Sequence, residues 1–251
     1  MKVAAIQHDI VWEDAAATRE HVAPLIAEAK ATGARLAALT EMYATGFSMR
    51  PEHMGEDESG PNEQFLAEQA EKHDMWLIGS VAQKGADGRY RNNAIVAAPS
   101  GEVQRYAKIH PFSYAREHEF YAAGDKFLTV EIDGVRVSVF VCYDLRFADE
   151  FWVRAFDTDL YVVVANWPEP RREHWRTLLR ARAIENQAYV LAANRVGSGG
   201  KLDYAGDSAI IDPLGRAIVE AQHAETVITA DVDPGTVAHV RETLPFLPDR
   251  R

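Results

Sequence analysis

The chain has 251 residues, of which 47% are hydrophobic, and a formal net charge of −11. It can therefore bury a large core, and its net charge argues against nucleic acid as a partner, because phosphate binding requires a clustered cationic surface. A single cysteine excludes intrachain disulfides and favours a cytoplasmic location. No segment has the roughly 18 apolar residues of a membrane span, and the N-terminus lacks the apolar core of a signal peptide, so we expect no membrane association.

Strands and helices are expected to alternate along the first half of the chain. Residues 2–7 predict a buried strand, and Val22, Ile26 and Ala29 recur at the steps of a helix over residues 18–31. Turn-forming residues at 86–88 and 99–101 indicate a hairpin. The other elements predicted here are a strand at 35–39, a helix at 62–72, a strand at 76–81 and hairpin strands at 93–98 and 102–106.

The second half continues this alternation and suggests how the sheets are covered. The turn at 133–134 joins strands at 127–132 and 135–141, and the wholly apolar strand at 160–165 indicates a sheet covered on both faces. The other elements predicted here are helices at 146–156 and 173–186 and strands at 188–193, 208–211, 217–219 and 226–232. With no linker or repeat, the pattern predicts one α/β domain over residues 1–251, with two packed sheets flanked by helices.

Three polar residues follow predicted strands. Glu41 comes after the strand at 35–39, Lys108 after 102–106 and Cys142 after 135–141. In open α/β sheets, ligands bind outside the carboxyl ends of strands. A thiol, a carboxylate and an ammonium together are a candidate nucleophile, base and electrostatic stabiliser. Taken singly, the cysteine is explained as a small buried side chain and the two charged residues as solvated loop residues.

Other kinds of site find little support in the sequence. The nine histidines show no metal-ligand spacing, and one cysteine disfavours a zinc site. There is no Gly-x-Ser-x-Gly elbow of a serine hydrolase and no dinucleotide-binding fingerprint after the first strand. The glycine-rich segment 197–201 is expected to be a flexible turn, because Arg195 and Leu202 occupy positions where a phosphate-binding loop needs glycine and serine or threonine. We therefore expect no metal site.

The chain resembles the nitrilase, or carbon–nitrogen hydrolase, superfamily in segments that follow one another in the expected order. These segments are TEMYATGFSM (40–49), YAKIH (106–110), VCYDLRF (141–147), NWP (166–168), ARAIENQ (181–187), NRVG (194–197) and GDS (206–208). The resemblance implies a four-layer α-β-β-α sandwich, a Glu-Lys-Cys triad, no cofactor and a homodimer. Two departures are Ala148, where relatives commonly have proline, and Lys201–Asp203 in a loop that can border the pocket.

The resemblance also implies roles for the three residues. Cys142 would attack an amide carbonyl and form a thioester, with Glu41 as general base. Lys108 would stabilise the oxyanion together with the backbone N–H of Tyr143. The superfamily has a second glutamate after the lysine segment; Glu117 matches its position best, and Glu119 is the alternative.

Within the superfamily, the Cys-Tyr-Asp sequence differs from the Cys-Trp-Glu of true nitrilases, and the segments at 45–49 and 166–168 resemble ω-amidases. Those enzymes hydrolyse the terminal amide of small dicarboxylate monoamides such as 2-oxoglutaramate, 2-oxosuccinamate and succinamate. Deaminated glutathione, an N-carbamoyl compound or an aliphatic amide are alternative substrates, and a non-catalytic binding protein is an alternative of another class.

Charged and aromatic residues near the motifs are candidates for the wall of the substrate pocket. Arg146 is the candidate partner of a distal carboxylate, with a structural ion pair to Asp144 or Asp149 as the alternative reading of the same residue. Arg171 and Arg172 are alternative cations. The aromatic residues that lie beside the motif residues, and that either wall the pocket or belong to the core, are Tyr43, Phe47, Phe112 and Trp167.

Overall fold

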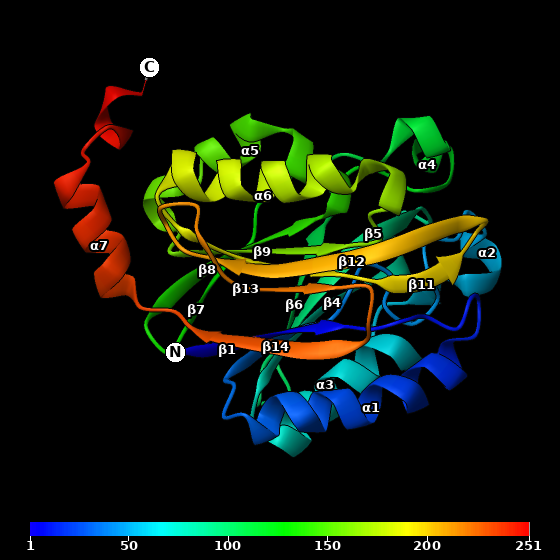
Figure 1. Cartoon of the computed structure of the whole chain (residues 1–251). Coiled ribbons are helices and arrows are strands. Elements are labelled where there is room, and N and C mark those ends of the chain that lie inside the picture. Colours follow the sequence, from blue (N-terminus) through cyan, green and yellow to red (C-terminus); the bar gives the residue numbers. More distant parts are fainter. Residues whose placement is uncertain (251) are drawn as a thin grey trace.

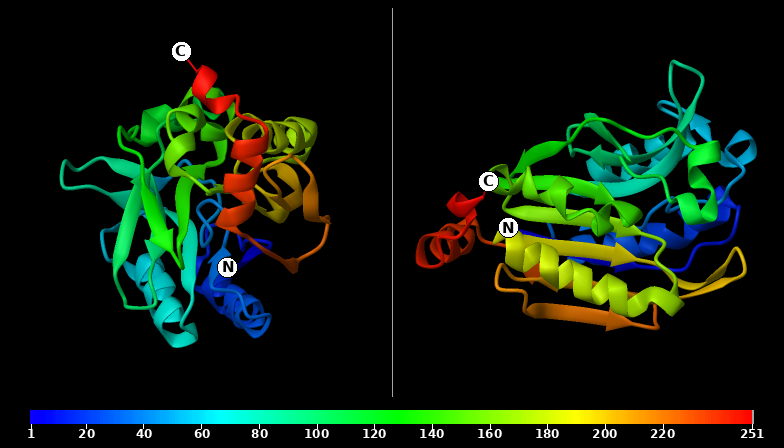
Figure 2. Two further views of the ribbon diagram at one scale, coloured as in Figure 1. Left: turned by 90° about the vertical axis from the view of Figure 1, so that its left-hand side faces the viewer. Right: turned by 90° about the horizontal axis from the view of Figure 1, so that it is seen from above.

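Two seven-stranded sheets pack face to face between helices, which confirms the predicted four-layer α-β-β-α sandwich (Figure 1). The computed structural model describes residues 1–250. One outer face carries α1 (Ala15–Ala31) and α3 (Pro61–His73), and the other carries α5 (Ala148–Trp152) and α6 (Arg172–Asn186). The remaining helices are α2 (Pro51–Met54), α4 (Glu117–Phe120) and α7 (Pro234–Thr243). Helix α7 stands at one end of the sandwich, beyond the sheets (Figure 2).

Each sheet has a parallel centre and antiparallel outer strands, except that the two-residue β3 pairs parallel with β4. The first sheet has the order β14 (Thr226–Asp231), β1 (Lys2–Gln7), β2 (Leu36–Ala38), β4 (Trp76–Lys84), β5 (Tyr90–Ala97), β6 (Val103–Ala107), with β3 (Glu56–Asp57) on β4. The second has the order β11 (Val196–Gly199), β12 (Leu202–Ile211), β10 (Tyr189–Asn194), β9 (Leu160–Ala165), β8 (Val135–Val141), β7 (Thr129–Ile132), with β13 (Ala217–Gln222) on β12. Parallel pairing joins β1, β2 and β4 in one sheet and β8, β9 and β10 in the other.

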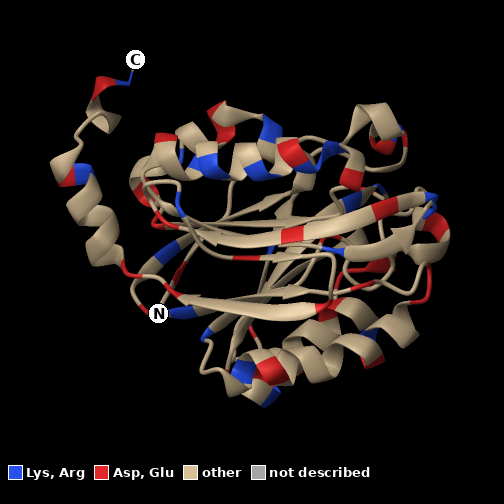
Figure 3. Ribbon diagram, viewed as in Figure 1, with Lys and Arg blue, Asp and Glu red and all other residues tan. Residues whose placement is uncertain are grey.

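The alternation of side chains along a strand builds two apolar layers at once. On β1, Val3 and Ala5 belong to the core between the sheets, whereas Ala4 and Ile6 pack in the layer under α1 and α3. Acidic and basic residues lie mainly on helices and connections (Figure 3). Among residues 1–250 no helix has the length and apolar character to cross a bilayer.

The helix expected over residues 146–156 is wrong, because this segment is divided. Cys142–Arg146 forms a 3-10 turn, α5 has five residues, and a second 3-10 turn follows at Ala155–Asp157. Phe147 interrupts the helical path with extended dihedral angles, φ −102° and ψ 92°. Its ring stacks on His110 with the centroids 3.6 Å apart, and this packing accounts for the break.

The flexible turn expected at 197–201 is also corrected, because these residues form β11 and its turn into β12. Ser198 pairs with Asp203 and Gly199 with Leu202, so β12 begins six residues before the strand predicted at 208–211. Glycine is depleted in strands, and its abundance here concealed the hairpin. Helix α7 is likewise absent from the prediction, although Asp233 caps it and Pro234 is its first residue.

Candidate active site

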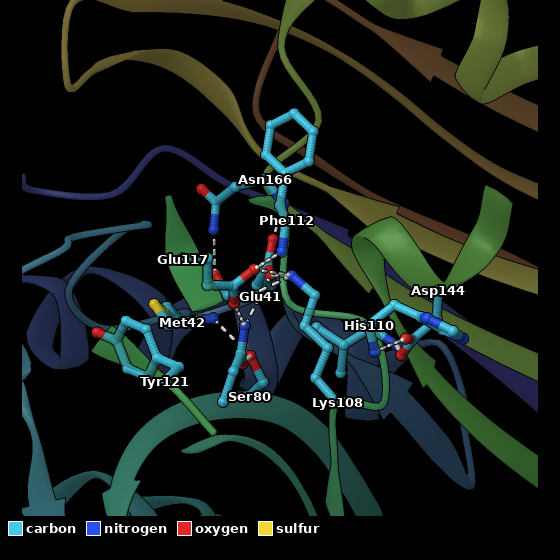
Figure 4. A network of polar contacts seen from close by, with 12 residues as sticks. Glu41, Met42, Ser80, Lys108, His110, Phe112, Glu117, Tyr121, Asp144 and Asn166 are labelled. Atoms are coloured by element: carbon cyan, nitrogen blue, oxygen red, sulfur yellow. Dashed lines mark hydrogen bonds and ion pairs between the residues drawn. The ribbon is translucent and has the colours of Figure 1, made fainter. Parts of the chain in front are cut away.

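Glu41, Lys108 and Cys142 lie at the same end of the sandwich. Lys108 directly follows β6, Cys142 directly follows β8, and Glu41 comes shortly after β2. Strands β2 and β6 belong to one sheet and β8 to the other, so the site is built where the two sheets meet. Figure 4 shows the polar network around Glu41 and Lys108.

Three donors hold the Glu41 carboxylate, which is fully buried. Its Oε1 accepts hydrogen bonds from Lys108 Nζ and Asn92 Nδ2, both at 2.8 Å. Its Oε2 accepts the backbone N–H of Asn166 at 2.9 Å, and the Asn166 side-chain amide donates to the Glu41 carbonyl. The orientation of the carboxylate is therefore set from both sheets.

Glu117 provides a second carboxylate for the Lys108 ammonium. Lys108 Nζ donates to its two oxygens at 2.9 and 3.2 Å, and the Phe112 N–H donates to it as well. Glu119 instead pairs with Arg116 at 2.6 Å on the surface. Of the two glutamates that the sequence left open, Glu117 is the one beside Lys108.

Burial and charge determine how these groups are protonated. Desolvation lowers the pKa of Lys108, but the charges of Glu117 and Glu41 outweigh it and hold that pKa well above its ordinary value. Desolvation raises the pKa of Glu117 although Lys108 opposes it. Desolvation, reinforced by the charge of Glu41, raises the pKa of Cys142 well above its ordinary value against the pull of Lys108. At neutral pH the cysteine is therefore a thiol that needs a base to become a nucleophile.

Cys142 sits in a sharp turn with left-handed dihedral angles, at φ 46°, a conformation that is strained for a residue with a side chain. The buried carboxylate of Asp144 holds this turn. It accepts the Val141 N–H at 3.0 Å, the Tyr106 hydroxyl at 2.9 Å and the His110 N–H at 2.8 Å. Burial raises the pKa of Asp144 to about 6.

A pocket opens at Cys142, and most of the candidate pocket residues named from the sequence line it. They are Phe47, Phe112, Tyr143, Arg146, Trp167 and the alternative cation Arg171. The rest of the lining is Ala115, Cys142, Asn166, Pro168, Leu202 and Tyr204. The free space, including the open mouth, is about 460 Å³, which suits a small ligand.

Tyr43 is wrongly predicted to wall this pocket. Its ring is fully buried in the layer under α1 and α3, where it stacks on Phe65 with centroids 6.3 Å apart. Its hydroxyl donates to the Asn62 carbonyl at 2.7 Å. Left-handed dihedral angles at Met42 and Gly46 turn the chain between β2 and Phe47, so Tyr43 and Phe47 enter different layers.

Several site residues have no clear signal in the sequence. Asn92 lies on β5 and donates to both Glu41 and Glu117, the latter at 3.2 Å. It precedes the hairpin strand predicted at 93–98 by one residue, so the sequence gives no signal for it. Tyr204 is concealed by the glycine-rich hairpin, and Asp144 acts from outside the pocket.

Two guanidinium groups face the pocket without an acidic partner. Arg146 lies over the Trp167 ring at 4.7 Å and contacts His174 Nδ1 at 3.2 Å, and Arg171 lies over the Phe112 ring at 5.4 Å. Desolvation, with a contribution from the charge of Arg171, lowers the pKa of Arg146. Within residues 1–250 neither arginine forms a salt bridge, so the structural ion pair that the sequence left open for Arg146 does not form.

Arg172 differs from its neighbour. It forms a bidentate pair with Asp207, at 2.8 and 3.0 Å, and does not line the pocket. The pocket thus offers the positive charge of Arg146 and Arg171 to a ligand. In the described part of the chain, no group of three or more His, Cys, Asp or Glu side chains is arranged to hold a metal ion.

Comparison with known proteins places these features in context. The family model of the carbon-nitrogen hydrolases matches residues 2–242. The chain is 38% identical over 254 residues to the omega-amidase YafV of Escherichia coli (strain K12), covering 99% of this chain and 96% of the relative. It is 37% identical over 219 residues to the 2-oxoglutaramate amidase of Bacillus subtilis (strain 168), covering 85% and 83%.

A solved structure shows the same fold. XC1258 from Xanthomonas campestris, a CN-hydrolase superfamily protein with an arsenic adduct in its active site, superposes with a TM-score of 0.94 at 37% identity. The match covers 100% of this chain and 97% of that structure.

Proposed function

Because the chain belongs to the carbon–nitrogen hydrolase family, we propose that it is a cysteine-dependent amidase acting on small dicarboxylate monoamides. The substrates would be 2-oxoglutaramate, 2-oxosuccinamate and succinamate, which are cleaved to the dicarboxylic acid and ammonia. One observation carries this proposal: a pocket with a thiol at its base also exposes two unpaired cations, Arg146 and Arg171. The names of the relatives support the same substrate class.

The first half of the reaction acylates Cys142. Glu41 takes the thiol proton while sulfur bonds to the amide carbon, because the raised pKa of Cys142 keeps the free thiol protonated. The tetrahedral intermediate then breaks its carbon–nitrogen bond. The leaving nitrogen receives the proton from Glu41 and departs as ammonia, leaving a thioester on Cys142.

The second half releases the acid. Glu41 takes a proton from water, whose oxygen attacks the thioester carbon. The carbon–sulfur bond breaks, the carboxylic acid leaves and the sulfur regains a proton. The hydrogen bonds that Glu41 accepts from Lys108, Asn92 and Asn166 support this role, because they keep the carboxylate in one place through both steps.

The oxyanion of each tetrahedral intermediate would be stabilised by Lys108 and by the backbone N–H of Tyr143. Lys108 is held as an ammonium by Glu41 and Glu117, which suits an electrostatic role and not that of a base. The Tyr143 N–H lies in the first turn of the 3-10 segment, where backbone donors lack partners within the helix. Glu117 would hold Lys108 and orient the substrate amide.

The distal carboxylate of the substrate would bind Arg146, with Arg171 as a second cation. Both arginines are fixed by aromatic rings, and a planar guanidinium recognises a carboxylate through paired hydrogen bonds. Phe47, Trp167 and Tyr143 would enclose the carbon chain between amide and carboxylate. A substrate without a distal acid, such as an aliphatic amide or an N-carbamoyl compound of that kind, would leave Arg146 and Arg171 without a negatively charged partner.

Ammonia release by the purified protein tests the proposal. The panel is 2-oxoglutaramate, succinamate, glutamine, butyramide, a nitrile and an N-carbamoyl amino acid, with Cys142→Ala as the blank. Turnover confined to the first two supports the proposed substrates. Turnover of another compound in the panel would support the thioester mechanism with a different substrate. No ammonia release from any compound, together with a Cys142 that does not react with thiol reagents, would reject the amidase and favour a binding protein.

A homodimer is part of the proposal. Large apolar side chains are exposed near the C-terminal end of α6, and they are Val153, Phe156, Ile184, Leu244 and Phe246. Leu244 is joined to this end of α6 through its carbonyl, which accepts the Gln187 side chain at 2.7 Å. A second copy of the chain would remove these side chains from water. We further propose that residues 1–251 fold as one domain in the cytoplasm, as the sequence predicts.

A further inference from the structure

The Trp12 indole packs on the backbone of two segments that are far apart in the sequence. A Cβ added to Gly46 would lie 2.8 Å from Trp12 Cε3, and a Cβ added to Gly199 would lie 2.8 Å from the same atom. A Cβ on Gly200 would lie 2.9 Å from Cη2. These separations are shorter than side chains tolerate, so only glycine allows the indole to approach each of these positions.

Both segments carry walls of the pocket. Gly46 precedes Phe47, and the hairpin of β11 and β12 carries Leu202 and Tyr204. Leu202 is 42% exposed, at the open side of the pocket. The indole therefore sets the separation between the Phe47 loop and the hairpin.

Arg195 stabilises the same hairpin through contacts of its buried side chain. This fully buried side chain donates through Nη2 to Asp9 Oδ1 at 2.5 Å and to the Ser198 carbonyl at 3.1 Å. Its guanidinium lies over the Tyr204 ring at 4.6 Å. Arg195 thus ties the segment after β1, which leads to Trp12, to both strands of the hairpin.

We propose that Trp12 and Arg195 are positioning residues that set the width of the pocket at Cys142 and thereby limit the enzyme to amides with short acyl chains. The limit on chain length rests on the proposed function, whereas the limit on width applies to any molecule that reaches the thiol. The walls cannot relax through side-chain rotation, because indole and backbone are in direct contact. Removing the indole leaves a cavity into which the loop and the hairpin can move.

Thiol alkylation tests the width without assuming a substrate. Cys142 is the only cysteine, so the rate of labelling reports on this pocket alone. We compare iodoacetamide with the bulkier iodoacetanilide. The wild-type protein is expected to react about tenfold more slowly with the larger reagent, and Trp12→Ala is expected to bring the two rates within about threefold of each other. An unchanged ratio in folded Trp12→Ala would overturn the proposal.

Two further variants make the result specific. Leu202→Ala changes an exposed side chain and is expected to shift the ratio of the two alkylation rates in the same direction as Trp12→Ala. This variant tests the pocket width even if Trp12→Ala folds poorly. Trp76→Ala is the matched control, because Trp76 pairs with Leu36 at the start of the parallel strands, away from the site. It is expected to keep the wild-type ratio, and a shift in this control equal to that of Trp12→Ala would count against the proposal.

Turnover of succinamate, glutaramate and adipamate then tests the chain-length limit. The wild-type kcat/KM is expected to fall along this series. Trp12→Ala is expected to raise KM for succinamate about tenfold with kcat within about twofold, which indicates a loss of binding and not of chemistry. It is also expected to reduce the fall in kcat/KM from succinamate to adipamate. A wild-type protein that hydrolyses neither these three amides nor 2-oxoglutaramate and 2-oxosuccinamate refutes the proposed substrates, whereas a steep series that stays steep in Trp12→Ala refutes only the positioning role.

Discussion

The Asp144 carboxylate accepts the backbone N–H of His110 at 2.8 Å and so joins the turn of the nucleophile to the segment that follows Lys108. Its other oxygen accepts the N–H of Val141, the residue before Cys142, at 3.0 Å. One buried anchor outside the pocket therefore sets the relative positions of the thiol and the ammonium.

Replacing Asp144 by Asn is expected to lower kcat by about 10- to 100-fold, because small displacements of reacting groups are costly, while KM changes little. An amide cannot accept all three donors, so one backbone or hydroxyl group loses its partner. Steady-state kinetics on the best substrate measure this effect. Tyr106→Phe is the control, since it removes one of the three donors and keeps the ring; a loss as large as that of Asp144→Asn would contradict the shared-anchor role.

Asp144 also predicts a pH dependence of stability. Its pKa is raised by burial from 3.8 to about 6 in the folded protein, so the folded state holds this proton more tightly than the unfolded chain. Its contribution is fully present below about pH 4 and is lost as the pH rises through 6. The free energy of unfolding of the wild type, relative to Asp144→Asn, should fall by up to about 3 kcal/mol between pH 4 and 7. Urea unfolding at four pH values checks this, and a constant difference would contradict it.

Replacing Glu41 by Gln is expected to reduce turnover to the level of Cys142→Ala, because no base remains to take the thiol proton or to activate water. Alkylation of Cys142 at neutral pH is expected to persist, because the substitution removes the negative charge that, together with burial, raises the pKa of the thiol and leaves the opposing charge of Lys108. Ammonia release measures the first effect, and labelling with iodoacetamide followed by mass detection measures the second. Glu119→Gln is the control, because its carboxylate pairs with Arg116 on the surface. Turnover by Glu41→Gln well above that of Cys142→Ala would show that Glu41 is not the base.

Replacing Arg146 by Leu is expected to raise KM for succinamate by about 10- to 100-fold, as expected for the loss of a charged hydrogen bond, and Arg171→Leu to raise it less. Hydrolysis of butyramide, if measurable, should be nearly unaffected because it has no distal acid. Arg172→Leu is a matched control, since Arg172 pairs with Asp207 outside the pocket. An equal rise in KM for succinamate and for butyramide would show that Arg146 supports the fold of the site and does not bind the carboxylate.

Replacing Phe156 by Glu is expected to convert the proposed dimer to a monomer, because it places a charge among the exposed apolar side chains near α6. Sedimentation velocity at micromolar concentration measures the change. Val11→Glu alters another exposed apolar residue, in the segment after β1, and should leave the dimer intact. A wild-type protein that sediments as a monomer would reject the dimer outright.

The sandwich could be predicted because its signals are local. Wholly apolar runs such as Leu160–Ala165 mark strands covered on both faces, and turns such as Asp133–Gly134 mark hairpins. The β11–β12 hairpin was not predicted because its glycines answer to distant segments, Gly199 and Gly200 to the Trp12 ring and Gly197 to the Asp9 carboxylate, and no local pattern reveals such contacts. The helix predicted over residues 146–156 failed for a similar reason, since the stacking of Phe147 on His110 divides it.

The residues of the candidate site show the same difference between local signals and long-range contacts. Glu41, Lys108 and Cys142 could be found because each follows a strand, whereas Asn92 and Asp144 act through contacts between distant segments. Tyr43 was misplaced because the turns at Met42 and Gly46 decide which layer each aromatic residue enters. The choice between Glu117 and Glu119 depended on the start of a four-residue helix, α4, which brings only the first toward Lys108.

The solitary thiol at the base of an open pocket has a consequence for oxidative damage. A small oxidant that enters would convert Cys142 to a sulfenic acid, and the chain has no second cysteine to trap it as an internal disulfide. Recovery would therefore depend on a reducing thiol narrow enough to pass between Phe47 and Leu202. The walls that limit the substrate would thus also decide which cellular reductants can repair the enzyme.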